Sequence, residues 1–173
     1  VQAKANGIEA YENKLKALDN QIHSLNDLQK LKILTIDNKV KQAKLTVSTD
    51  SAGWKAAEID YKTSITRLNR QEEMYEQGLI SLTELETRRL KLQETKAKAI
   101  EKENKYGLSV NKYINTLIEQ DQVVSEFEEK ISEVDSKRRS AGSEQYAGLG
   151  EMYQMRTQSV SYPPLTLQTN SAD

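Results

Sequence analysis

Few side chains in this sequence belong to the types that carry out catalysis or bind metal ions. The 173 residues include a single histidine, His23, and no cysteine. Soft metal sites are built from several imidazole or thiolate ligands, so the sequence predicts no such site and no cofactor. The adjacent carboxylates Glu72 and Glu73 point in different directions on a helix and do not form an acid/base pair. Since phosphate-binding and nucleophile motifs are also missing, we expect a protein that is not an enzyme, with His23 on its surface.

The residues best suited to recognition surround one break in an otherwise helical sequence. Gly78 can adopt the left-handed conformation that closes a helix. Ser81 is followed three residues later by Glu84, which is the spacing of a capping box. The sequence therefore predicts a helix ending near Gln77, a short turn over residues 78–81, and a second helix from Leu82, as in the tip of an αα-hairpin. Local chemistry alone leaves an ordinary helix–helix corner as the alternative.

A wider pattern surrounds this turn. Arg70, Met74 and Ser81 follow the spacing R-x-x-x-L-x-x-x-x-x-x-S, with Met74 in place of the leucine. This segment resembles the hairpin tip of periplasmic adaptors, the membrane fusion proteins of the HlyD type found in type I secretion and efflux systems. The resemblance is sharpest from Thr66 to Gln93. Methionine is similar in volume to leucine and adapts its shape easily, so we expect the contact at Met74 to be retained.

The resemblance implies a function in assembling a conduit rather than in catalysis. By analogy with the family, the tip would dock onto an outer-membrane channel of the TolC type, and the full-length protein would meet an inner-membrane transporter. Arg70 would hydrogen-bond to the channel, Met74 and Leu79 would pack into a groove, and Ser81 would cap its helix and offer a hydroxyl, with Gly78 forming the turn. The resemblance also implies a homo-oligomer, usually a hexamer, located in the periplasm and anchored in the inner membrane.

Composition favours long helices that bury a narrow seam. Hydrophobic residues make up 36% of the chain and charged residues 29%, which is too polar for a compact core and too periodic for disorder. The formal net charge is −1 and no basic stripe is present, so nucleic-acid binding is not expected. No apolar run reaches the length needed to span a bilayer and no signal peptide opens the sequence, so we expect a segment of a larger protein.

We predict an outgoing arm that is broken in two. Apolar residues recur at intervals of three and four over residues 3–47, but the stripe blurs from Leu28 to Ile36. A stutter would explain this, as would packing by a third helix or a neighbouring protomer. From Thr46 to Gly53, weak helix formers predict a break, with Asp50 or Ser51 capping the next helix over residues 54–77. A tight reversal that produces a three-helix bundle is the alternative.

The returning arm is predicted over residues 82–140 or beyond. One heptad line supports it, formed by Leu85, Leu92, Ala99, Tyr106 and Tyr113. Residues 158–173 contain two prolines and are expected to form an extended tail, which the resemblance implies is the edge of a lipoyl-like β-domain. The predicted fold is thus all-α, a long antiparallel coiled-coil α-hairpin over residues 1–157 with a broken outgoing arm and a short extended tail. The alternative function is a self-associating coiled-coil scaffold.

Overall fold

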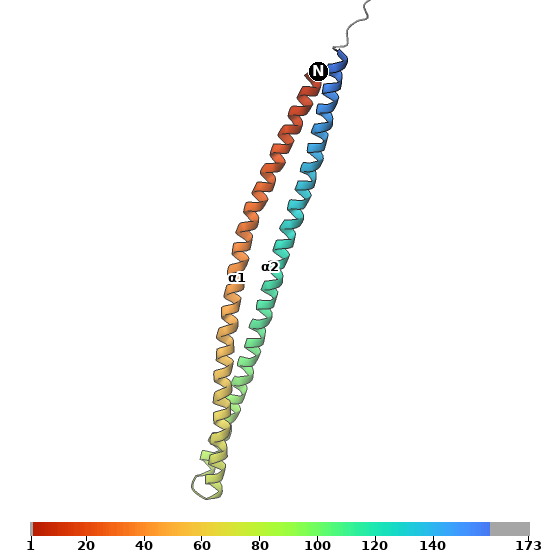
Figure 1. Ribbon diagram of the computed structural model, residues 1–173. Helices are drawn as coiled ribbons and strands as arrows, with labels where there is room; N and C mark the ends of the chain where they lie inside the picture. Colours follow the sequence, from red (N-terminus) through yellow and green to blue (C-terminus); the bar gives the residue numbers. More distant parts are fainter. Residues whose placement is uncertain (1, 160–173) are drawn as a thin grey trace, which may run out of the picture. The chain divides into compact units, whose positions relative to one another are not determined.

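The computed structural model consists of two long α-helices that pack against each other as an antiparallel hairpin (Figure 1). It describes the backbone of residues 2–159 and the side chains of residues 6–158. Helix α1 spans Gln2–Glu76, helix α2 spans Leu82–Ser159, and the described residues include no strand. The predicted all-α hairpin and the position of its turn are therefore confirmed.

The hairpin divides into two compact units. One unit comprises residues 30–125 and includes the turn; the other comprises the arms up to residue 29 and from residue 126 onward. In the unit of residues 30–125, α1 presents a continuous seam at alternating intervals of four and three residues. Its buried or half-buried members are Ile36, Val40, Ala43, Val47, Asp50, Trp54, Ala57, Tyr61, Ser64, Leu68 and Gln71.

The predicted break in the outgoing arm is wrong. Helix α1 runs without interruption through residues 46–53, and the seam continues through Val47, Asp50 and Trp54 at its regular spacing. The hydroxyl of Thr49 donates a hydrogen bond to the carbonyl oxygen of Leu45 at 3.0 Å, so this polar side chain is satisfied within the helix. Packing along the seam thus overrides the weak helix propensity of the segment, because tertiary contacts outweigh local preferences of a few tenths of a kcal/mol per residue.

Large and small seam residues alternate in the unit of residues 30–125. The rings of Trp54 and Tyr106, from opposite arms, stack with their centroids 5.4 Å apart. Between the large residues lie small or polar ones, such as Ser109 and Thr116 on α2. Their hydroxyls donate to the carbonyl oxygens of Tyr106 and Lys112, in both cases at 2.8 Å. Over the described residues no buried side-chain polar atom lacks a hydrogen-bond partner, so the polar seam carries no unpaired group.

The cross-arm ion pairs of this unit confirm that the arms are antiparallel. Lys39 Nζ lies 2.9 Å from Glu119 Oε1, and Lys105 Nζ lies 3.2 Å from Asp50 Oδ1. Asp50 occupies a seam position and is 8% exposed, so Lys105 neutralises a carboxylate that would otherwise be buried without a partner.

In the second unit, the two arms bury a seam of their own. Its most buried members are Phe127, Val134 and Ala141 on α2, and Arg138 pairs with Asp19 across the arms. Helix α2 continues beyond Ser140 to Ser159, which resolves the open end of the predicted returning arm. The expected extended tail is wrong for its first two residues, which are helical, and its remainder lies outside the described residues.

The blurred stripe of α1 corresponds to a change in seam spacing. Half-buried positions fall at Leu25, Gln29 and Ile33, two successive intervals of four residues, before Ile36 resumes the alternation. Two consecutive intervals of four are the signature of a stutter, so the spacing in α1 favours the stutter among the explanations that the sequence left open. Leu31, which contributed to the blurred pattern, is exposed.

Candidate functional site

The turn at the hairpin tip closes α1 with a Schellman motif. Gly78 has a φ of 71°, in the left-handed region. Its N–H donates to the carbonyl oxygen of Tyr75, and the N–H of Leu79 donates to that of Met74, both at 2.9 Å. These are the two hydrogen bonds that define the motif. A Cβ added to Gly78 would meet nothing within 4 Å, so backbone conformation, not lack of space, calls for glycine here.

Helix α2 begins with the predicted capping box. The N–H of Glu84 donates to Ser81 Oγ at 3.2 Å, and the N–H of Ser81 donates to Glu84 Oε2 at 3.0 Å. Leu85 follows immediately, and its side chain is only 2% exposed. The first turn of α2 is therefore held both by its cap and by the seam.

All four predicted contact residues, Arg70, Met74, Leu79 and Ser81, are exposed around this turn. Arg70 and Met74 are four residues apart and lie on one face of α1. Leu79, at the turn itself, is 65% exposed. No ion pair involves Arg70 among the described residues. The tip thus presents a cation and two apolar side chains on its surface, supported by a turn whose backbone hydrogen bonds are satisfied.

Ser81 is exposed, but its hydroxyl is already engaged. Besides accepting the hydrogen bond from Glu84, Ser81 Oγ lies 3.4 Å from Glu84 Oε2, to which it donates. The structure brings Ser81 together with Glu84 and joins Met74 to Leu79 through the backbone, whereas no hydrogen bond links Arg70 to the other predicted residues in the described part of the chain. The predicted role of Ser81 as a cap is confirmed, and its predicted contact with a partner stays a prediction.

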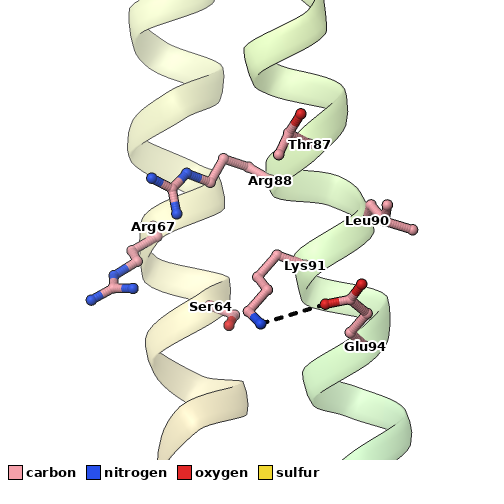
Figure 2. Close-up of a pocket in the computed structure, with 7 residues that line it drawn as sticks. All are labelled: Ser64, Arg67, Thr87, Arg88, Leu90, Lys91 and Glu94. Carbon is pink, nitrogen blue, oxygen red and sulfur yellow. Dashed lines mark hydrogen bonds and ion pairs between the residues drawn. The ribbon is translucent and has the colours of Figure 1, made fainter.

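A groove lies between the two arms near the tip, lined by the last turns of α1 and the first turns of α2 (Figure 2). Its volume is about 210 Å³. The side chain of Arg88 extends from α2 toward α1, near the point where the side chain of Arg67 projects from α1 (Figure 2). A second hollow continues it away from the tip and adds Asp60, Thr63, Thr95 and Lys98 to the lining. The lining near the tip consists of Ser64, Arg67, Thr87, Arg88, Leu90, Lys91 and Glu94.

Cations outnumber carboxylates in this groove. Among the lining residues the cations are Arg67, Arg88, Lys91 and Lys98, and the carboxylates are Asp60 and Glu94. Lys91 Nζ lies 3.4 Å from Glu94 Oε2, whereas Arg67 and Arg88 form no ion pair with any described residue. Two guanidinium groups therefore face solvent from opposite arms of the hairpin without a carboxylate partner.

Sequence reasoning missed the groove residues. The groove forms only when the antiparallel register brings Arg67 beside Arg88, and the sequence does not reveal that register. One signal was available, because Lys91, Lys98, Lys105 and Lys112 recur every seven residues and so share one flank of α2. A row of like charges beside the seam could have marked that flank as cationic.

Over the described residues, the surroundings of His23 and of the acidic side chains are those of a helix surface. His23 is 82% exposed and its Nε2 lies 3.5 Å from Asp27 Oδ2, which confirms its predicted surface position. No group of three or more His, Cys, Asp or Glu residues suited to a metal ion is found in the described part.

A hydrogen bond from Lys137 and its charge lower the pKa of the exposed Glu133, away from the tip. Over residues 2–159, neither helix has a stretch long and apolar enough to cross a membrane.

Comparisons of the chain with protein-family models, with curated proteins and with solved structures found no match.

Proposed function

We propose that this chain is the hairpin segment of a periplasmic adaptor in a type I secretion or efflux system. In this role, the tip docks onto an outer-membrane channel of the TolC type, and the remainder of the full protein meets an inner-membrane transporter. The full protein would be a periplasmic homo-oligomer, such as a hexamer, anchored in the inner membrane. Its work is to assemble and seal a conduit, which requires no catalytic group.

The observation that carries the proposal is the capped tip with its exposed contact residues. A left-handed Gly78 and the Ser81 capping box hold a tight turn between two packed arms. Around it, Arg70, Met74 and Leu79 are exposed. A self-associating rod of continuous helices would have no need of a glycine turn between capped helices, so these features favour the adaptor over a scaffold of that kind.

Each tip residue has a role that follows from its chemistry. The guanidinium of Arg70 presents a planar set of donors that matches carboxylate or carbonyl oxygens on a partner. Met74 and Leu79 supply apolar area on either side of the turn, where burial would stabilise the complex by about 25 cal/mol per Å². Ser81 and Gly78 keep the turn in the conformation that presents these side chains.

An export assay with the full-length protein tests this proposal. Replacing Arg70 by Asp reverses the charge of an exposed side chain, so the circular dichroism of the segment should be unchanged. We expect secretion of the exported substrate to be lost. Arg139→Asp is the control for charge reversal at an exposed helical arginine, and Arg139 belongs to the other unit. Unlike Arg70, Arg139 pairs with a carboxylate, that of Asp135, so this control perturbs its own helix more than Arg70→Asp does. Normal export by the Arg70→Asp protein, or equal loss in the control, would contradict the tip assignment.

A further inference from the structure

The groove beside the tip is separate from the residues to which the proposed function assigns contacts. Arg67 and Arg88 contribute to it from opposite arms, and neither is paired with a carboxylate in the described part of the chain. Arg88 occupies the seam position between Leu85 and Leu92 but is exposed, so it adds nothing to the seam's burial. Neither packing in the seam nor an ion pair within the hairpin therefore explains why these two arginines lie here.

The groove is suited to binding carboxylates. A guanidinium offers planar, paired donors that match the two oxygens of a carboxylate, and it keeps its charge at any physiological pH. Lys91 and Lys98 add two ammonium groups on one flank of α2. The hydroxyl of Ser64 lies among these cations and can donate to the same oxygens, whereas the hydroxyl of Thr87 already donates to the carbonyl oxygen of Thr83.

The dimensions of the groove favour a helical ligand. Lys91 and Lys98 are seven residues apart on α2, which corresponds to about 10 Å along the helix axis. Carboxylates seven residues apart on a partner helix have the same separation. Leu90 is 61% exposed at the edge of the groove and provides an apolar contact for such a helix.

The same groove is poorly suited to a polyphosphate chain. Asp60 and Glu94 are interspersed with the cations and would repel a continuous row of phosphates. A helix with carboxylates only at chosen positions can avoid both of these acidic side chains, including Glu94, which pairs with Lys91.

We propose that the groove lined by Arg67, Arg88 and Lys91 is a docking site for an acidic helical segment of a partner protein. On α1, the residues Asp60, Thr63, Arg67, Arg70 and Met74 follow one another at intervals of three and four, so the groove and the tip share one face of the helix. A partner could therefore engage both. The inference does not depend on the adaptor role, because it requires only the groove.

Fluorescence anisotropy with a designed peptide tests the site on the complete 173-residue chain. The probe is a fluorescein-labelled helical peptide of about 20 residues with glutamates seven residues apart on one face. A matched peptide carries glutamines at those positions. We expect the glutamate peptide to bind about tenfold more tightly than the glutamine peptide, with a dissociation constant that rises as salt is added.

The variant Arg67→Gln/Arg88→Gln should lose that preference. Both side chains are exposed, so its helical circular dichroism should match that of the parent chain. Lys55→Gln/Lys62→Gln removes the same charge from the opposite flank of α1 and should bind the glutamate peptide within about twofold of the parent chain. Equal weakening by the two double variants would show that net charge alone attracts the peptide and would overturn the proposal. Failure of the parent chain to discriminate between the peptides would overturn it as well.

Sedimentation analysis without peptide tests whether a second copy of the chain fills the groove instead. Exposed carboxylates on α1, such as that of Glu73, could reach the groove of a neighbouring molecule. If the chain self-associates and Arg67→Gln/Arg88→Gln abolishes that association, the occupant is another copy and the proposal is wrong. Self-association that is unchanged in this variant, or a monomer, together with the expected peptide preference, supports it.

Discussion

Gly78 adopts a conformation that other residue types reach only at a cost. Its φ of 71° lies in the left-handed region, and no atom is close enough to obstruct a side chain. Gly78→Ala should therefore destabilise the chain by about 1–2 kcal/mol through the backbone alone. Chemical denaturation followed by circular dichroism measures this change.

Gly107 provides the matched control. It lies inside α2 without a positive φ, is exposed, and also has nothing within 4 Å of an added Cβ. Gly107→Ala should raise the free energy of unfolding by about 1 kcal/mol, because alanine is the better helix former. If Gly78→Ala raises the free energy of unfolding as Gly107→Ala does, the turn conformation does not constrain Gly78.

Ser81 has two proposed roles, and one substitution can separate them. Ser81→Ala removes the acceptor for the N–H of Glu84 and should cost about 1 kcal/mol, seen as faster hydrogen exchange of the first amides of α2. Ser81→Asn keeps an N-cap acceptor but has no hydroxyl, so exchange should remain slow. If the hydroxyl also contacts the channel, export by the full-length protein should fall with Asn although the cap is intact.

Leu85 is the buried seam residue of α2 nearest the tip. It is 2% exposed in the first turn of α2, so Leu85→Ala should leave a cavity and cost about 2–5 kcal/mol of unfolding free energy. Leu90 on the same helix is largely exposed, and Leu90→Ala should change stability by less than about 0.5 kcal/mol. Thermal denaturation of the two variants measures the difference. Comparable losses would mean that the seam near the tip is not formed as described.

The turn could be read from the sequence because its chemistry is local. Gly78, Ser81 and Glu84 act within a few residues of one another, so their types and spacing are enough to predict the Schellman and capping geometry. The helix across Thr46–Gly53 could not be read in this way. There, local propensity predicts a break, whereas the seam residues Val47 and Trp54 are held by the facing arm.

The cationic groove lies beyond local reasoning for a related reason. Arg67 and Arg88 are separated by the whole tip in sequence, and their approach depends on which residues of the two arms face each other. The repeat of lysines at Lys91, Lys98 and Lys105 indicates a charged flank, but it does not identify what lies opposite. Pairs such as Lys39 with Glu119 fix that register only in the folded hairpin.

At the scale of the molecule, the unit of residues 30–125 contains the features that a stable hairpin requires. It has a continuous seam on α1, the capped turn, the stack of Trp54 on Tyr106, and cross-arm pairs such as Lys105 with Asp50. Its border at residues 29 and 30 coincides with the change in seam spacing between Gln29 and Ile33. The packing contacts of this unit are thus made by residues of the unit itself.

We accordingly expect residues 30–125 to fold when produced alone. Trp54 is the only tryptophan in the chain, so its fluorescence reports directly on the seam. The isolated segment should be helical, and its tryptophan emission should match that of the complete chain and shift cooperatively on unfolding. A segment of residues 30–76 is the control, since it retains Trp54 but lacks the arm that carries Tyr106, and should show solvent-exposed emission. A shorter hairpin buries less surface, so its thermal midpoint should be lower than that of the complete chain. If residues 30–125 are unfolded alone, the hairpin depends on its outer arms, and the tip could not be a structurally independent docking element.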